Sequence, residues 1–264
     1  MRFSVILLLS FFIVSFGSAQ DLEMGIFGGG SYYLGDVNPS GHFKNTQIAY
    51  GIIGRYNINS RWAVKMSAYR GKIAGNASSN WFLPNRNLQF ESPVTDISAV
   101  AEFNFWPYFT GSRRNFITPY VYAGIGICFF QPSSEGVKLQ PLGTEGQQLG
   151  YDGRKPYSLA GFNIPFGLGV KVGITKKLGV ALFWEMHKTF SDYLDDISTT
   201  YYLDGERIDP NNTPEYLSDP TMSYQPGMQR GNSRNDDWYS FYGITITYKF
   251  ALIGSKRCKD IYTD

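Results

Sequence analysis

The sequence is poor in charge, in cysteine and in histidine. Lys and Arg total 24 against 22 Asp and Glu, so the chain lacks the basic excess with which nucleic-acid-binding proteins neutralise phosphates. Two cysteines cannot build a disulfide framework, and two histidines without a CxxC pair do not supply the ligands of a zinc site. We therefore expect no nucleic-acid partner and no metal.

A complete nucleotide-binding fingerprint is also missing. The pairs Gly124 and Gly126, and Gly167 and Gly169, resemble its glycines, but neither pair completes the GxGxxG pattern or opens a helix. Glycines of strands that face the inside of a barrel explain both pairs better. We expect no cofactor and no small-molecule substrate.

No apolar stretch reaches the roughly 18 residues of a membrane-spanning helix, which excludes a helical multispanning protein. The most apolar segment lies at the N-terminus, where Arg2 precedes the runs 5–9 and 11–14 and the segment closes on Gly17, Ser18 and Ala19. This order is typical of a secretory signal peptide. We assign residues 1–19 to a signal peptide that is cleaved before Gln20.

Helical periodicity is almost absent from the rest of the chain, which instead alternates with period two. In the run 164–173, apolar residues at every second position alternate with Pro165, Gly167, Gly169, Lys171 and Gly173. Such alternation is typical of β-strands with one apolar face. The aromatic fraction of 17%, the 29 glycines and a charged fraction of 17%, below the roughly 25% of soluble domains, favour β structure in lipid. Eight such runs occur: 22–33, 47–57, 62–71, 96–106, 117–130, 164–173, 178–187 and 241–250.

The connections between these runs alternate in length. Long polar segments cover 34–46, 72–95, 131–163 and 190–237, whereas the links 58–61, 107–116 and 174–177 are short. An even number of antiparallel strands with tight turns at one end and long loops at the other is the pattern of a bacterial outer-membrane barrel. The sequence thus predicts an all-β, eight-stranded antiparallel transmembrane β-barrel over residues 20–250, with long extracellular loops. Residues 251–264 form a periplasmic C-terminal tail.

A soluble eight-stranded barrel of the lipocalin kind shows the same period, but its apolar face points inward. If a soluble barrel had its apolar face pointing outward, it would expose continuous apolar rows to water, and such rows cause aggregation. We favour the lipid-facing assignment. The opposite face then carries four charges of each sign, which could pair across the lumen of a narrow barrel and close it. They are Arg55, Lys65, Lys171 and Lys249 with Glu23, Asp96, Glu102 and Glu185.

Aromatic residues near the ends of the runs suggest the girdles that mark the two membrane interfaces. They are Tyr32, Tyr56, Trp62, Phe105, Trp106, Tyr120, Trp184, Trp238 and Tyr239.

Three groups of residues could in principle take part in catalysis, metal binding or redox chemistry. Glu185, His187 and Ser191 lie at the outer end of the seventh run, where an enzyme acting on lipid A would need them, but alternation places Glu185 and His187 in the lumen, away from lipid. We therefore predict no catalytic residues. The fourth loop is rich in carboxylates that lack the spacing of a calcium loop, and we interpret it as a solvated acidic segment. Cys128 is expected to be a small buried residue, and Cys258 lies in the tail.

Several strings resemble the PorG-like outer-membrane proteins of the type IX secretion system. They are Gly29 to Asp36 followed by Asn38 and Pro39, Asp192 to Tyr201, and Gly231 to Ser233 leading to Asp237, Trp238 and Tyr239. The string that begins Asp-Tyr-Leu-Asp-Asp at Asp192 is the most specific. The similarity runs from the first strand to the last, but here the chain continues beyond Phe250 to Asp264.

The resemblance implies an integral protein of a Gram-negative outer membrane, in contact with outer-membrane lipid and with the periplasmic ring of a machine that exports proteins. It implies no catalytic residues. Two other classes stay open from the sequence: a small barrel enzyme acting on lipid A, and a passive OmpA-like barrel, adhesin or small porin. A lumen crossed by charges argues against conductance, because porins with an aqueous channel use 16 to 18 strands.

Overall fold

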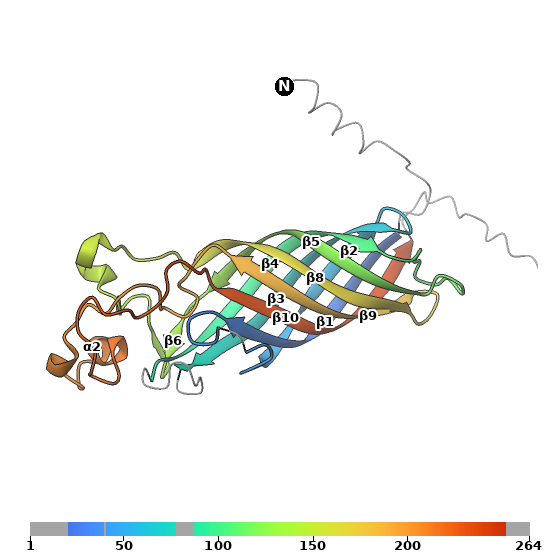
Figure 1. Ribbon diagram of the computed structural model, residues 1–264. Coiled ribbons are helices and arrows are strands. Elements are labelled where there is room, and N and C mark those ends of the chain that lie inside the picture. Colours follow the sequence, from blue (N-terminus) through green and yellow to red (C-terminus); the bar gives the residue numbers. More distant parts are fainter. Residues whose placement is uncertain (1–20, 40, 78–86, 252–264) are drawn as a thin grey trace, which may run out of the picture.

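A computed structural model describes residues 21–39, 41–77 and 87–251, and in that part of the chain ten strands form one antiparallel sheet (Figure 1). Eight of them are long: β1 (Asp21–Leu34), β2 (Gln47–Asn57), β3 (Trp62–Asn76), β4 (Gln89–Asn104), β5 (Ile117–Phe130), β8 (Ala160–Gly173), β9 (Leu178–Thr189) and β10 (Trp238–Ala251). The other two, β6 (Ser133–Ser134) and β7 (Val137–Lys138), form a small hairpin whose Ser133 pairs with Glu91 of β4.

The sheet closes on itself. The long strands follow the order β3-β2-β1-β10-β9-β8-β5-β4, and β3 pairs with β4 to complete the circle. Because every long strand has two neighbours, the ladder leaves no open edge along the body of the wall. The fold is therefore the closed eight-stranded antiparallel barrel that the alternating pattern predicted.

The two ends of the barrel differ as predicted. Short turns join the strands at the end where Asp21 pairs with Ala251, and the long connections gather at the opposite end (Figure 1). We call the first end the turn end and the second the loop end. The predicted signal peptide 1–19 and the predicted tail beyond Ala251 lie outside the described residues. None of the helices in the described ranges is long and apolar enough to span a membrane.

Two strands are longer than their apolar pattern indicates. The sequence places a loop over residues 72–95, but the ladder between β3 and β4 continues to the pair Asn76 and Gln89. In this extension most outward side chains are polar, as in the ion pair between Lys72 and Glu91, and none is large and apolar, so the apolar face ends while backbone pairing continues. β8 and β10 also begin before their predicted runs, at Ala160 and Trp238.

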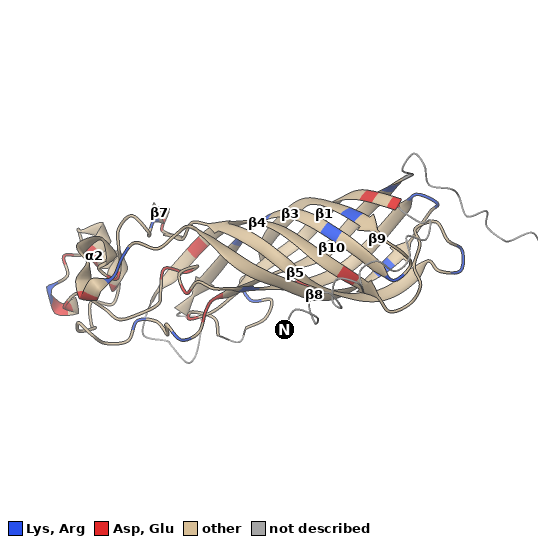
Figure 2. Ribbon diagram, turned by 90° about the horizontal axis from the view of Figure 1, so that it is seen from above, with Lys and Arg blue, Asp and Glu red and all other residues tan. Residues whose placement is uncertain are grey.

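The outer wall of the barrel is an apolar band. Large side chains such as Ile26, Ile52 and Ile125 expose 61%, 63% and 73% of their surface, and they alternate along each strand with buried residues. Charged residues interrupt the strands at few positions and otherwise gather in the loops (Figure 2). The apolar-out assignment is thus correct for the described residues.

The predicted aromatic girdles are correct only in part. Trp62, Phe105 and Trp106 are exposed on the outer surface near the turn end. Tyr120 and Tyr239 instead point into the lumen, and residues 42 and 43 of the first loop cover Tyr32 on the outer wall. Alternation decides which aromatic residues face inward, so proximity to the end of a strand was not a sufficient criterion.

The lumen holds the charged network that the sequence predicted. Arg55 donates through Nη1 to Glu23 Oε2 at 2.9 Å and through Nε to Glu102 Oε2 at 2.7 Å, and Lys171 Nζ lies 2.6 Å from the same Glu102 oxygen. Lys65 Nζ lies 2.9 Å from Glu185 Oε2. All six side chains are nearly inaccessible to solvent, so the pairs replace the hydration that each charge has lost.

Farther toward the loop end, His187 joins two carboxylates. Its Nε2 lies 3.0 Å from Glu185 Oε1 and its Nδ1 lies 3.4 Å from Asp96 Oδ2. The Tyr239 hydroxyl donates to Asp96 Oδ2 at 2.7 Å, and the Tyr239 ring stacks on His187. The polar network therefore runs on from the charge pairs through this group.

The eighth predicted charge, Lys249, is not part of the sealed network. It pairs with Asp21 at 3.1 Å at the mouth of the turn end, where both side chains are partly exposed. The connection between β4 and β5 closes this mouth instead. Its Tyr108 and Thr110 are buried, and Thr110 Oγ1 donates to Glu23 Oε1 at 2.6 Å.

Removing one member of the sealed network should lower the free energy of unfolding far more than removing one member of an exposed ion pair. We expect Glu102→Gln to lower the free energy of unfolding by about 3–5 kcal/mol, because it leaves Arg55 and Lys171 without their shared carboxylate. In the matched control Glu91→Gln, which breaks the exposed pair with Lys72, we expect a loss of at most about 1 kcal/mol. Urea titrations followed by heat-modifiable gel mobility measure both. Equal urea midpoints for the two variants would contradict this account.

Candidate functional site

Two long connections, 131–159 and 190–237, fold together beyond the loop end of the barrel (Figure 1). They contain the short helix α2 (Thr213–Ser218) and the 3-10 turns η2 (Gln147–Leu149), η3 (Tyr151–Gly153) and η4 (Gly205–Arg207). We call these two connections the cap. The prediction of a solvated acidic loop was wrong for half of its carboxylates, because five of them are buried: Asp192, Asp195, Asp196, Asp219 and Asp237.

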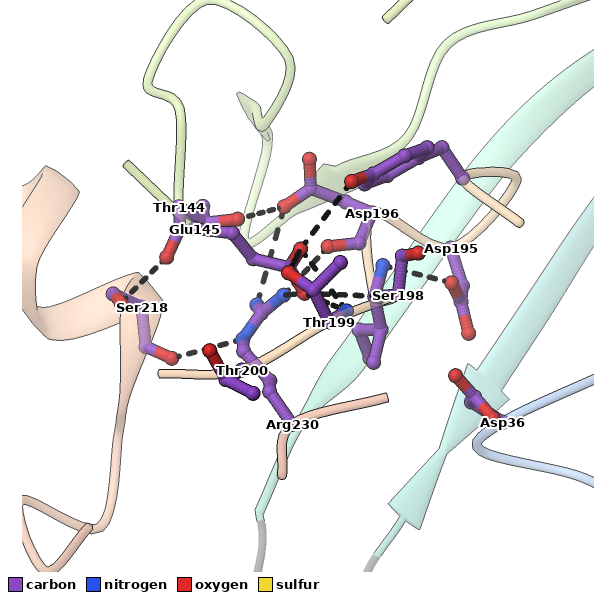
Figure 3. A network of polar contacts seen from close by, with 12 residues as sticks. Asp36, Thr144, Glu145, Asp195, Asp196, Ser198, Thr199, Thr200, Ser218 and Arg230 are labelled. Carbon is purple, nitrogen blue, oxygen red and sulfur yellow. Dashed lines mark hydrogen bonds and ion pairs between the residues drawn. The ribbon is translucent and has the colours of Figure 1, made fainter. Parts of the chain in front are cut away.

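The centre of the cap is a buried ion pair between Arg230 and Glu145 (Figure 3). Arg230 Nη1 donates to Glu145 Oε1 at 3.1 Å and to the Asp196 carbonyl oxygen at 2.6 Å. Glu145 accepts backbone N–H bonds from Ser198 at 2.9 Å and Thr199 at 3.1 Å, and the Thr199 hydroxyl donates to it at 2.5 Å. One carboxylate from the first connection thereby fixes the backbone of the second.

Asp196, from the second connection, binds side chains of the first connection in the same network. Its carboxylate accepts from the Thr144 hydroxyl and from the Tyr157 hydroxyl, the latter at 2.6 Å. The Tyr157 ring stacks on Tyr193 with centroids 4.5 Å apart. Burial is the main cause that raises the pKa of Asp196 to about 6, against which the charge of Arg230 acts.

A tyrosine of the barrel wall joins the cap to the strands. The Tyr33 hydroxyl of β1 lies 2.6 Å from Asp195 Oδ2 and 2.6 Å from Asp237 Oδ1. A phenol carries one proton and can donate to only one of these carboxylates, so the other must carry a proton and donate to the Tyr33 oxygen. Asp195 and Asp237 also accept from the backbone N–H of Ile197 and Leu194, both at 2.9 Å.

Burial among other acids keeps protons on this side of the cap. Desolvation first, and then the charge of Asp36 on Asp195 and of Asp195 on Asp237, raises the pKa of both carboxyls well above the usual range. Desolvation likewise raises the pKa of Asp192 to about 8. The neutral, proton-bearing state of these carboxyls is therefore the one that the folded cap favours.

The three strings that resemble the PorG-like proteins meet in this network. Tyr33 comes from the first string, Asp195 from the second and Asp237 from the third, and the backbone N–H of Asn232 donates to Asp36 Oδ2 at 2.8 Å. Sequence reasoning did not find Glu145 or Arg230 as partners, since a single acid and a single base far apart in polar loops show no pattern. The resemblance and the many carboxylates of the fourth loop were the signals that pointed toward this region.

The residues considered for catalysis do not assemble. Glu185 and His187 lie in the sealed lumen, while the Ser191 hydroxyl accepts from the backbone N–H of Tyr193 at 3.3 Å. Within the described ranges, no group of three or more His, Cys, Asp or Glu side chains is placed to hold a metal ion. Cys128 is buried, as expected, and Cys258 lies outside the described residues.

Residues 2–203 match the family described as Domain of unknown function (DUF6089), and the chain belongs to that family. No curated protein matches it.

Solved structures with a similar fold include three bacterial proteins. Neisserial surface protein A is 9% identical with a TM-score of 0.47, and the match covers 87% of this chain and 97% of that one. Ail of Yersinia pestis, in complex with the heparin analogue sucrose octasulfate, is 11% identical with a TM-score of 0.42 over 88% and 99% of the chains. OprG of Pseudomonas aeruginosa is 9% identical with a TM-score of 0.42 over 89% and 98%.

The raised pKa values predict that the cap loosens as the pH rises. A carboxyl whose folded pKa exceeds its unfolded value contributes stability that is complete below the unfolded value and is lost as the pH passes the folded one. For Asp196 and Asp192 this window extends from about pH 4 to pH 8. We expect hydrogen-exchange protection of the Ile197 and Thr199 amides, corrected for intrinsic rates, to fall between pH 5 and pH 9.

The variant Asp192→Asn should reduce this fall, because an amide does not titrate. The control Asp209→Asn, at an exposed position of the same loop, should leave it unchanged. Protection that rises with pH would contradict the assignment.

Proposed function

We propose that this protein is a β-barrel of the outer membrane of a Gram-negative bacterium, with the turn end in the periplasm and the cap outside the cell. The observation that carries the proposal is the apolar band around the barrel together with the charge-paired lumen. A soluble protein would expose this band to water, whereas lipid covers it without cost. The closed ladder also satisfies the backbone polar groups, as the hydrocarbon region requires.

We further propose that the barrel is neither a pore nor an enzyme. Its lumen is filled with ion pairs and aromatic side chains, and buried residues close the turn end. The group formed by Glu185 and His187 is enclosed with them, away from any lipid substrate. The body of the barrel therefore acts as a rigid anchor, and its function lies in the surfaces at its two ends.

Charges placed on the outer wall should test the membrane assignment. We expect Val170→Arg and Ile246→Arg each to destabilise the barrel in lipid, since both side chains face outward from the apolar wall. The loss should reach about 2–4 kcal/mol for Ile246 in the middle part of β10 and be smaller for Val170, which lies nearer the turn end. Lys176→Arg, in the exposed turn before β9, is the matched control and should have no effect. Urea titration of barrels folded into vesicles measures the difference. Wild-type midpoints for both wall variants would show that lipid does not cover this face.

We propose that the anchor serves a protein secretion machine of the type IX kind and contacts its periplasmic ring. The resemblance to PorG-like proteins supports this function, and so does the charge of the turn end. Three connections meet there: the backbone N–H of Tyr108 donates to the Ser60 carbonyl oxygen at 3.0 Å, and Gly111 lies against the carbonyl oxygen of Lys176. The exposed side chains of this face include Arg61, Arg113, Lys176 and Lys177, which suit an acidic partner surface.

A second candidate function, a surface adhesin, is favoured by the ordered cap. Its two connections are tied together by the Arg230 and Glu145 pair, so the cap presents a fixed surface outside the cell. An anchor for a secretion ring has no evident need for such a surface.

Charge reversal at the turn end separates the two functions. We expect Arg113→Glu combined with Lys176→Glu and Lys177→Glu to reduce recovery of periplasmic ring proteins in crosslinked pull-downs from envelopes, and to reduce cargo secretion. The barrel should keep its heat-modifiable mobility. Arg207→Glu, on the exposed side of the cap, is the control and should change neither readout. If the wild-type protein recovers no ring component, the secretion function is wrong and the adhesin function gains support.

A further inference from the structure

An apolar hollow of about 480 Å³ lies on the outer wall where β1, β2, β3 and β4 run side by side. It exists because Ala68 is small: its neighbours across the ladder are Ile52 on β2 and Ile97 on β4, which stand much higher from the wall. The outward side chains around the hollow are Ile26, Tyr50, Ile52, Ala68, Arg70 and Thr95.

A single cation stands at the loop end of this hollow. Arg70 points outward from β3, opposite Tyr50 in the ladder, and its Nη1 donates to Thr95 Oγ1 at 2.8 Å. In the part of the chain that the structure describes, no carboxylate pairs with Arg70. The next outward residue on the strand, Lys72, is by contrast neutralised by Glu91.

The position of Arg70 is that of a headgroup contact. On the turn-end side of it, outward residues of β3 are the apolar Val64, Met66 and Ala68, and beyond it no large apolar side chain faces outward on β3. Arg70 therefore lies where the apolar band ends, with its guanidinium held by Thr95 and directed toward the interface. Guanidinium groups bind phosphate through paired, charge-assisted hydrogen bonds.

We propose that this hollow binds one lipid A molecule of the outer leaflet, with an acyl chain over Ala68 and a phosphate on Arg70. The inference rests on the proposed outer-membrane location, which puts the loop end, and hence Arg70, in the outer leaflet. An apolar hollow with an unneutralised cation at its outer end complements a lipid that has an anionic head and saturated chains. Tyr50 completes the site by covering one side of the chain.

The wall offers an internal comparison. A second apolar hollow of about 610 Å³ is lined by outward residues that include Ala101, Val121, Phe166 and Leu168, and no charged residue lines it. It is able to accept an acyl chain but has no contact for a phosphate. If apolar shape alone were enough, both hollows would retain lipid A equally.

Native mass spectrometry of the full-length barrel in dodecyl maltoside, titrated with diphosphoryl lipid A and separately with phosphatidylcholine, tests the site. We expect one lipid A per barrel in the wild type and an about tenfold or larger loss of affinity in Arg70→Gln. Ala68→Leu, which fills the hollow, should cause a similar loss. The controls Lys72→Gln and Ala101→Leu should bind lipid A as the wild type does.

The outcomes separate this inference from the proposed function. Arg70→Gln with wild-type heat-modifiable mobility and undiminished lipid A binding would overturn the lipid site while leaving the membrane barrel intact. Equal loss in Arg70→Gln and Lys72→Gln would also overturn it, because any surface cation would then serve. Equal affinity for phosphatidylcholine and lipid A would overturn the choice of lipid A, because a zwitterionic lipid would then serve as well as an anionic one.

Discussion

The narrow lumen of an eight-stranded barrel is the constraint on which the rest of this structure depends. Such a barrel has room only for its own side chains, so each charge that points inward must find a partner on another strand. Glu102 receives both Arg55 and Lys171, and Lys65 reaches Glu185. These pairs join strands on different sides of the barrel, so side chains in the lumen cross-link the barrel in addition to its backbone ladder.

The buried polar network of the lumen continues into the cap. His187, Asp96 and Tyr239 lead toward the loop end, and there the Tyr33 hydroxyl of β1 meets Asp195 and Asp237 of the cap. In the lumen, cations offset the carboxylates. In the cap, where Arg230 faces several acids, shared protons also reduce the repulsion between the carboxylates. Because the cap favours protonated carboxyls, its stability decreases as the pH rises.

A sealed body leaves three surfaces for function: the basic turn end, the cap and the lipid-facing wall. The turn end offers positive charge on connected turns, which suits recognition of an acidic periplasmic partner. The cap offers a fixed outer surface. The wall, with Arg70 above the hollow over Ala68, is the surface that we propose to contact lipid. The proposed anchor function requires rigidity between these surfaces, and the cross-linked lumen supplies it.

The sequence alone determined the closed barrel, because period-two alternation shows in each strand separately and the lengths of the connections alternate between its two ends. Of the eight charges that it assigned to the lumen, seven lie in the sealed network, since parity along a strand assigns the face. Parity does not show where a ladder ends, so the runs predicted for β3 and β4 were too short at the loop end. It also places no partner for a residue in a loop. That Glu145 meets Arg230, or that Tyr33 lies between Asp195 and Asp237, was decided by tertiary structure, because loops have no repeating geometry and their contacts depend on how separate connections pack together.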